Sequence, residues 1–239
     1  MDVPTTVTTA LEDQPIDGAT CLEAGAGVGN ATAGLLAAGA ARVYAVTNDA
    51  DHASTVRDRV GRRAPDRTAV VEADLRALPM AANSVDVITA HGLCNVLTPS
   101  ALETVATELT RVAVPGCHLV VDDYEPPPAD AAVRELFALE NAVTELADGR
   151  PALTFYPATM LRRLFAGHGW TVDRERTLLD PVPWTRAHVE AHAEVVRSEA
   201  AELPDELRDP LLAELERLVA AIGKESIGEM YSIAMRFPG

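Results

Sequence analysis

The sequence contains almost no lysine: Lys224 is the only one, and arginine supplies the other basic residues. These arginines form no stripe of the kind that displaces counterions from a phosphate backbone, so we expect no nucleic-acid partner. The net charge is −16, and acidic residues are spread along the whole chain. A surface of this kind stays hydrated at high salt, which predicts a salt-adapted protein.

Long apolar runs are absent as well. No uninterrupted apolar segment is long enough to span a bilayer, and the first residues lack the charged start and apolar stretch of a signal peptide. We therefore expect a cytoplasmic protein with no membrane partner. The three cysteines, Cys21, Cys94 and Cys117, stand at unrelated spacings. They predict reduced core residues, and the lack of a Cys-x-x-Cys or clustered Cys/His pair predicts no metal site.

One stretch near the start of the chain is informative. A short apolar segment at residues 19–24 runs into three alternating glycines, Gly25, Gly27 and Gly29, and an alanine-rich helix follows. Because glycine lacks a Cβ, such a loop brings its peptide planes against a nucleotide-like ligand. A dinucleotide fingerprint has its third glycine at the position of Asn30, so a nicotinamide or flavin dinucleotide fits this loop poorly.

Apolar segments then alternate with helical patterns along the first half of the chain. Further strands are predicted at residues 42–46, 68–72, 86–90 and 118–123, with helices at 31–40, 51–60 and 100–112 between them. Five β units separated by helices predict an α/β fold with a doubly wound parallel sheet. In such a sheet the carboxyl ends of the strands lie along one cleft. Five residues fall at or near these ends: Glu23, Thr47, Asp74, Ala90 and Asp122.

The pattern E-x-G-x-G-x-G at residues 23–29 resembles the first motif of class I S-adenosylmethionine-dependent methyltransferases. Residues 78–86, which lead through a proline to a strand starting at Asp86, and residues 111–121, in which Cys117 replaces a glycine, resemble later segments of the same family. The resemblance covers residues 19–121. It implies a seven-stranded, mostly parallel Rossmann-like methyltransferase sheet with an antiparallel last strand, and S-adenosylmethionine as the cofactor.

The resemblance assigns cofactor-binding roles to the glycine loop and to the acidic residue before it. Gly25, Gly27 and Gly29 would lie under the cofactor, with the methionyl carboxylate at the amino end of the following helix. Glu23 would sit beside the amino group of the cofactor, or would accept hydrogen bonds from N–H groups of the loop.

The end of the second strand departs from the family. There an acidic residue holds both ribose hydroxyls, but the register places Thr47 at this position. A threonine hydroxyl makes one hydrogen bond where a carboxylate accepts two. Asn48 or Asp49 could hold the ribose instead, or could cap the helix that follows.

Asp74, at the end of the third strand, matches the adenine-binding position of the family. Its carboxylate would accept from the exocyclic amine of adenine, and the N–H of Leu75 would bond a ring nitrogen. The alternative is that Asp74 caps a helix before Arg76. Ala90, at the end of the fourth strand, completes the predicted cofactor site.

Methyl transfer from a sulfonium is an in-line displacement, which needs an aligned acceptor and excluded water. It needs a base only when the acceptor must lose a proton. His91, Asp122 and Tyr124, at the exits of the fourth and fifth strands, are the catalytic candidates. The alternatives are a His91 bonded to backbone and an acidic pair, Asp122 and Asp123, that binds a cationic amine. The fourth strand is not followed by the Pro-Pro-aromatic or Pro-Cys motifs of enzymes that methylate nucleic acids.

Three prolines at residues 126–128 predict a division of the chain into a cofactor-binding core, residues 1–125, and an acceptor-side half, residues 126–239, that completes the same sheet. In this half we expect helices at 131–147 and 157–167 and strands at 170–174 and 230–237. The two strands flank a long helical insertion at residues 183–229. The insertion would cover the acceptor, make a homodimer contact or form a solvated hairpin.

The sequence therefore predicts S-adenosylmethionine-dependent methyl transfer to a small-molecule acceptor, with a protein side chain as the second choice. Two alternatives stay open. One is a non-catalytic regulatory or scaffold subunit that binds the cofactor, and the other is a different nucleotide-dependent enzyme on the same fold.

Overall fold

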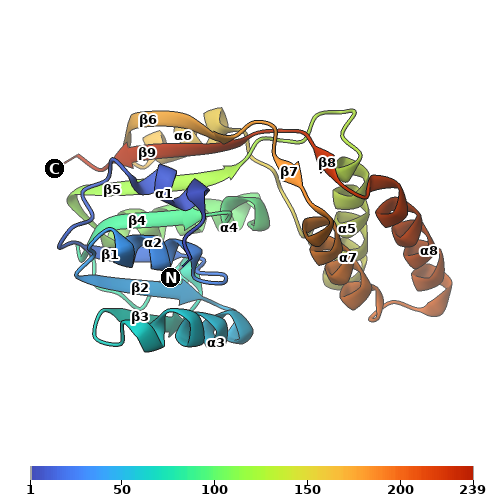
Figure 1. The fold of residues 1–239 in the computed structure, drawn as a ribbon, viewed down its shortest axis with the longest axis horizontal. Coiled ribbons are helices and arrows are strands. Elements are labelled where there is room, and N and C mark those ends of the chain that lie inside the picture. The colour runs from blue at the N-terminus through green and yellow to red at the C-terminus, as the bar shows by residue number, and fades with distance from the viewer. Residues whose placement is uncertain (1, 239) are drawn as a thin grey trace.

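The computed structural model describes residues 2–238 and places seven strands in one sheet (Figure 1). The sheet order is β3-β2-β1-β4-β5-β9-β6. β9 pairs antiparallel with β5 and β6, and the remaining pairs are parallel. The predicted doubly wound, mostly parallel sheet is therefore confirmed. Its strands are β1 (Thr20–Ala24), β2 (Arg42–Thr47), β3 (Thr68–Glu72), β4 (Val85–His91), β5 (Ala113–Tyr124), β6 (Thr171–Leu179) and β9 (Met230–Arg236).

The order of the strands reverses beside β1. The chain moves outward from β1 through β2 to β3 and then returns to place β4 on the other side of β1. Ala24 pairs with both Val46 and Ala90, so the carboxyl ends of β1, β2 and β4 lie at one edge of the sheet. A ligand crevice forms at such a reversal, because the loops after the two central strands leave in opposite directions.

Helices cover both faces of the sheet (Figure 1). On one face, Leu35 of α2 packs in a cluster that includes Val120 of β5. On the other face, Leu109 of α4 packs in a cluster that includes Leu119, the neighbour of Val120, because successive side chains of a strand point to opposite faces. The sheet-covering helices are α1 (Thr5–Leu11), α2 (Asn30–Ala37), α3 (Ala50–Arg59), α4 (Pro99–Val112) and α6 (Ala158–Gly167).

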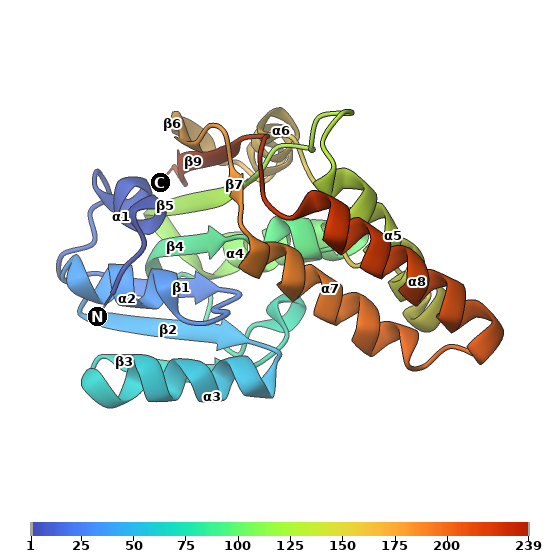
Figure 2. The same cartoon turned by 45° about the vertical axis from the view of Figure 1, so that its right-hand side comes forward.

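A helical lobe projects beyond the carboxyl ends of the parallel strands (Figures 1 and 2). It contains α5 (Val133–Asp148), α7 (Arg186–Ala200) and α8 (Asp205–Ile222), together with the short pair β7 (Pro183–Trp184) and β8 (Glu225–Ser226). These helices share a separate apolar cluster that includes Leu136, Val196 and Leu215. The helices predicted within residues 183–229 are therefore present, and α5 joins them. The division at residues 125 and 126 stays a prediction.

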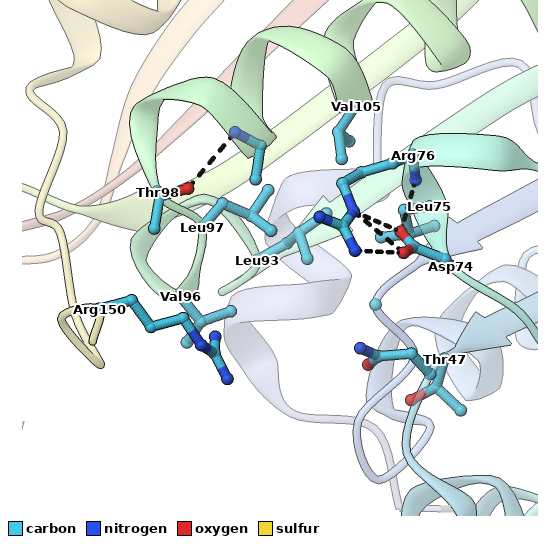
Figure 3. A pocket seen from close by; sticks show the side chains of 13 residues that line it. Thr47, Asp74, Leu75, Arg76, Leu93, Val96, Leu97, Thr98, Val105 and Arg150 are labelled. Carbon is cyan, nitrogen blue, oxygen red and sulfur yellow. Dashed lines mark hydrogen bonds and ion pairs between the residues drawn. The ribbon is translucent and has the colours of Figure 1, made fainter. Parts of the chain in front are cut away.

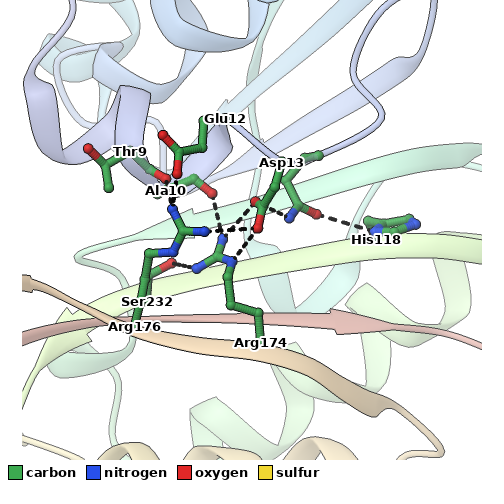
Figure 4. A network of polar contacts seen from close by, with 9 residues as sticks. Thr9, Ala10, Glu12, Asp13, His118, Arg174, Arg176 and Ser232 are labelled. Carbon is green, nitrogen blue, oxygen red and sulfur yellow. Dashed lines mark hydrogen bonds and ion pairs between the residues drawn. The ribbon is translucent and has the colours of Figure 1, made fainter.

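The first helix is held on the sheet by two arginines of β6 (Figure 4). Arg174 donates to the carbonyl oxygen of Ala10 at 2.7 Å, and Arg176 donates to that of Thr9 at 2.9 Å. Both guanidinium groups also pair with Asp13. Cations at the carboxyl end of a helix stabilise its last carbonyl groups and its dipole. Among the described helices, none is long and apolar enough to cross a membrane.

Candidate functional site

A cavity of about 560 Å³ lies at the carboxyl edge of the sheet (Figure 3). Five of its lining residues were predicted to bind the cofactor: Gly25, Thr47, Asn48, Asp74 and Leu75. Eight others were not predicted: Arg76, Leu93, Val96, Leu97, Thr98, Ala101, Val105 and Arg150. The loops after β1, β2 and β3 thus meet at one cleft, as the topology requires.

The glycine loop presents bare backbone to this cleft. Gly25 has a φ of +74°, and a Cβ built there would lie 2.7 Å from Cδ1 of Leu93. Gly27 has a φ of +48°, and a Cβ there would meet nothing within 4 Å. Both positions need a left-handed backbone that side chains oppose. Gly25 is also required by packing, whereas Gly27 leaves open space in front of the loop.

Glu23 supports the loop from behind. Its side chain is buried, and its carboxylate accepts from the N–H of Ala31 at 3.1 Å and from the N–H of Thr32 at 2.9 Å. The hydroxyl of Thr32 donates to the same carboxylate. Burial raises the pKa of Glu23 to about 7, although these donors act in the opposite direction. Of the two expectations for Glu23, the geometry matches the hydrogen bonds to backbone, which fix the start of α2.

The three candidates for ribose binding separate in the structure. Thr47 and Asn48 line the cleft, and the hydroxyl of Thr47 accepts from the N–H of Asp49 at 3.2 Å. The carboxylate of Asp49 instead caps α3, accepting from the N–H of His52 at 2.8 Å. Asp49 therefore takes the capping role. No carboxylate from this segment lines the cleft, so a threonine and an asparagine stand where the family has an acid.

Asp74 lies at the cleft and also takes the predicted capping role. It lines the cleft beside Leu75, and it caps the 3-10 turn η2 (Leu75–Ala77) by accepting from the N–H of Arg76 at 2.8 Å. The side chain of Arg76 folds back onto the same carboxylate (Figure 3). This contact lowers the pKa of Asp74, so the group is charged at neutral pH.

The catalytic candidates lie on one face of the sheet, and none of them is among the residues that line the cavity. Nδ1 of His91 is 3.0 Å from Oδ2 of Asp122, and Oδ1 of Asp122 is buried without a partner in residues 2–238. Burial lowers the pKa of His91, but the hydrogen bond and charge of Asp122, with the charge of Glu23, raise it overall. The ring of Tyr124 lies 5.5 Å from that of Trp184 at the base of the helical lobe.

Asp123 points away from these candidates, because it follows Asp122 on the strand. Its buried carboxylate accepts from the N–H of Asn95 at 3.0 Å and from the N–H of Tyr124 at 2.8 Å. Ala90 is buried within β4 and pairs with Ala24. Within residues 2–238, no three His, Cys, Asp or Glu side chains gather as metal ligands would.

The unpredicted wall of the cleft depends on contacts between distant segments. The N–H of Thr154 donates to the carbonyl of Asn95 at 2.6 Å, and the hydroxyl of Tyr156 donates to that of Leu97 at 2.8 Å. These bonds fix the segment after α5, which carries Arg150, against the turn η3 (Cys94–Val96). Arg76 could have been predicted as a residue of the cleft, because it is a basic residue only two positions from Asp74. The sequence around Arg150 contains no predicted site residue that would have indicated its place in the cleft.

The comparisons with known proteins agree with the observed fold. Residues 21–116 match a family model described as a methyltransferase domain. No curated protein matches the chain by sequence.

Three solved structures illustrate the similarity. The [4+2]-cyclase SpnF is 18% identical with a TM-score of 0.65, over 97% of this chain and 79% of that one. The YcgJ protein from Bacillus subtilis is 12% identical with a TM-score of 0.64, over 98% and 97%. Geranyl diphosphate C-methyltransferase from Streptomyces coelicolor A3(2), in complex with Mg²⁺, geranyl diphosphate and S-adenosyl-L-homocysteine, is 14% identical with a TM-score of 0.62, over 97% and 76%. At these identities the likeness establishes a shared fold.

Proposed function

We propose that this chain, whose residues 21–116 form a methyltransferase domain of the class I S-adenosylmethionine-dependent family, methylates a small-molecule acceptor by in-line displacement. One observation carries the proposal. The cavity at the carboxyl edge of the sheet is lined by Gly25, Thr47, Asn48, Asp74 and Leu75, which come from the ends of three different strands and match the positions that hold the cofactor in this family.

The cleft fits S-adenosylmethionine in shape and in polarity. The open space in front of Gly27 admits a ligand against the peptide planes, while Glu23 behind the loop holds the N–H groups of Ala31 and Thr32 at the start of α2. In the proposed arrangement Asp74 and the N–H of Leu75 hold adenine, while Thr47 and Asn48 hold the ribose. Gly25, Gly29 and Ala90 shape the site through their backbone. When bound, the cofactor supplies an electrophilic methyl group on a sulfonium.

The chain itself would align the acceptor and take up its proton where one is lost. His91 is the proposed base, since the one side-chain hydrogen bond of its ring among the described residues is the bond between Nδ1 and Asp122. A carboxylate in this position fixes the tautomer of the imidazole and stabilises its protonated form. Tyr124 is proposed to bound the acceptor on the side of the helical lobe.

The acceptor is proposed to be a small molecule, since the acidic chain has no basic stripe for a nucleic acid. Geranyl diphosphate C-methyltransferase, a structural neighbour, acts on a small molecule. We further propose that the protein works in a salt-adapted cytoplasm and forms a homodimer through the helical lobe. A thermal melt across potassium chloride concentrations tests the salt adaptation. We expect the melting temperature to rise with salt, and a melting temperature that does not rise would count against this proposal.

A second candidate rests on SpnF, a cyclase that shares this fold. In this second candidate function the chain binds the cofactor without transferring its methyl group. It would then be an enzyme of another class or a scaffold subunit. The departure at Thr47 also fits this candidate, because no acidic side chain of residues 47–49 lines the cleft.

Isothermal calorimetry with S-adenosylmethionine and S-adenosylhomocysteine tests the proposal. We expect both compounds to bind, and we expect Gly27→Val and Asp74→Ala each to abolish binding without unfolding the protein. A transfer assay with labelled S-adenosylmethionine and a panel of small hydroxyl, amine and thiol compounds then separates an enzyme from a binding protein. If both variants bind as tightly as the wild type, the assignment of the cleft is wrong.

A further inference from the structure

The carboxylate of Asp74 is shared with a guanidinium inside the cleft. Nε of Arg76 lies 3.0 Å from Oδ1 and 2.9 Å from Oδ2 of Asp74, and Nη2 lies 2.6 Å from Oδ2 (Figure 3). The backbone N–H of Arg76 adds a fourth contact, at 2.8 Å to Oδ1. Both residues line the cavity, so this pair faces any ligand that binds there.

These contacts engage both oxygens of the carboxylate. An ionised carboxylate offers about four lone-pair directions, two on each oxygen. Three N–H groups of Arg76 occupy most of them: the backbone N–H donates to Oδ1, Nη2 donates to Oδ2, and the single hydrogen of Nε is shared between the two oxygens. A ligand that must donate a hydrogen bond to Asp74 therefore competes with Arg76 for the carboxylate.

The pair is strong enough to compete and weak enough to be displaced. The side chain of Arg76 is 60% exposed and that of Asp74 is 45% exposed, so water screens their attraction. Exposed ion pairs of this kind change an equilibrium by only about twofold to fivefold. Arg150, the other arginine of the cavity, pairs with Asp148 and makes no contact with Asp74.

We infer that Arg76 is a specificity-determining residue, which competes with the amino group of adenine for Asp74 and favours a purine that presents a carbonyl oxygen at the same place. This inference rests on the proposed function, because it takes the base of the cofactor to lie at Asp74. Adenine presents a donor there and must displace the guanidinium. Hypoxanthine presents an oxygen that the guanidinium can bond and the carboxylate repels.

The test uses S-adenosylhomocysteine and S-inosylhomocysteine, in which a carbonyl oxygen replaces the amine of adenine and the adjacent ring nitrogen gains a hydrogen. Because the N–H of Leu75 is the same in every variant, each ligand is compared with itself across the variants. Arg76→Met keeps the length of the side chain and removes its charge and its donors. Arg62→Met is the matched control, because Arg62 is exposed, pairs with Asp58 and lies outside the cavity. Calorimetry measures both ligands against the wild type and both variants, and a thermal melt of each protein confirms folding.

Arg76→Met is expected to bind S-adenosylhomocysteine about twofold to fivefold more tightly than the wild type, and S-inosylhomocysteine more weakly by a similar factor. Arg62→Met should change neither affinity. Added potassium chloride should narrow the difference between Arg76→Met and the wild type, because salt screens an exposed pair. A merely structural role of Arg76 would move both ligands in the same direction.

Three results would overturn the inference. Arg76→Met could bind both ligands with unchanged affinity, could lose affinity for both, or could match the effect of Arg62→Met. In each of these cases the wild type still binds S-adenosylhomocysteine, so the proposed function survives. If neither the wild type nor Arg76→Met binds S-adenosylhomocysteine, the proposed function fails, and the inference that rests on it fails too.

Discussion

The cleft has two sides, here called the first and second bank. A buried carboxylate supports each of them, but one presents backbone to the cleft and the other presents side chains. The first bank is the glycine loop, residues 25–29, whose Gly25 lines the cavity with backbone. The second bank, residues 74–76 and 93–98, lines it with side chains, among them those of Arg76 and Leu97. Behind the first lies Glu23, which is 2% exposed, and behind the second lies Asp123, which is 1% exposed. Each carboxylate accepts hydrogen bonds from backbone N–H groups in the segment that follows a strand, where the backbone has left the sheet.

The difference between the banks lies in what a substitution removes. In the first bank the ligand surface is the backbone itself, so any added atom occupies ligand space or forces the loop to move. In the second bank the ligand surface consists of side-chain ends, which can rotate or be exchanged while the backbone stays in place. We therefore expect the first bank to be the more sensitive to change.

After the loss of binding expected for Gly27→Val and Asp74→Ala, the next largest effect is expected at Gly25. Gly25→Val should weaken S-adenosylhomocysteine binding by at least about 100-fold, equivalent to roughly 3 kcal/mol, because the new side chain collides with Leu93 at the cleft. Gly18→Val is the control: Gly18 has the same φ of +74°, and its Cβ would meet nothing within 4 Å. It should lose stability through strain and keep its affinity. Equal affinities in both variants, measured by calorimetry, would contradict a backbone-built bank.

The first bank could be predicted from the sequence, because its geometry is local. The E-x-G-x-G-x-G pattern needs only the strand before it and the helix after it, and Glu23 bonds residues eight and nine positions away. Asp74 was found in the same way, as an acid at the end of a strand. The alternating strands also located the sheet and its switch point, so the fold was predictable to the same extent.

The part of the second bank at residues 93–98 could not be predicted, because it depends on packing between distant segments. Leu93 lies in the cleft because β4 ends beside β1, and Arg150 lies there because Tyr156 and Thr154 bond to residues 97 and 95. Asp123 and Asp122 look equivalent in the sequence, but the alternation of the strand directs them to opposite faces. The helical lobe was predicted as helices, while the membership of α5 needed three-dimensional contacts.

The next effect compares the two supporting carboxylates directly. Glu23→Gln and Asp123→Asn each place an amide NH₂ against backbone donors, so each should lower the free energy of unfolding by about 1–3 kcal/mol. Their effects on binding should differ. Glu23→Gln should weaken S-adenosylhomocysteine binding by about tenfold and Asp123→Asn by less than about threefold, because the first bank binds through its backbone. Urea unfolding and calorimetry measure the two effects, and equal losses of affinity would remove the distinction.

The same two carboxylates predict a pH dependence of stability. Burial raises the pKa of Glu23 to about 7 and the pKa of Asp123 to about 6. The folded state thus holds these protons more tightly than the unfolded state. Their stabilising contribution is complete below about pH 4 and is lost as the pH rises through 6 and 7.

We expect the free energy of unfolding to fall by on the order of 1–3 kcal/mol between pH 5 and pH 8. The raised pKa of His91 acts in the same direction. Urea unfolding at a series of pH values measures the slope, and both Glu23→Gln and Asp123→Asn should flatten it. If neither variant changes the slope, these carboxyls are ionised in the folded protein throughout this window.

The smallest expected effect lies between the banks, at the end of β2, where Thr47 stands in place of an acid. Thr47→Asp should tighten S-adenosylhomocysteine binding by about threefold to fivefold, since a carboxylate accepts from two ribose hydroxyls and can still accept from the N–H of Asp49. Thr47→Asn is the matched neutral control and should change the affinity less. The gain should shrink for the 2′-deoxy analogue of the ligand, which offers one hydroxyl fewer. If Thr47→Asp tightens both ligands equally, the ribose lies elsewhere and the two banks alone hold the nucleoside.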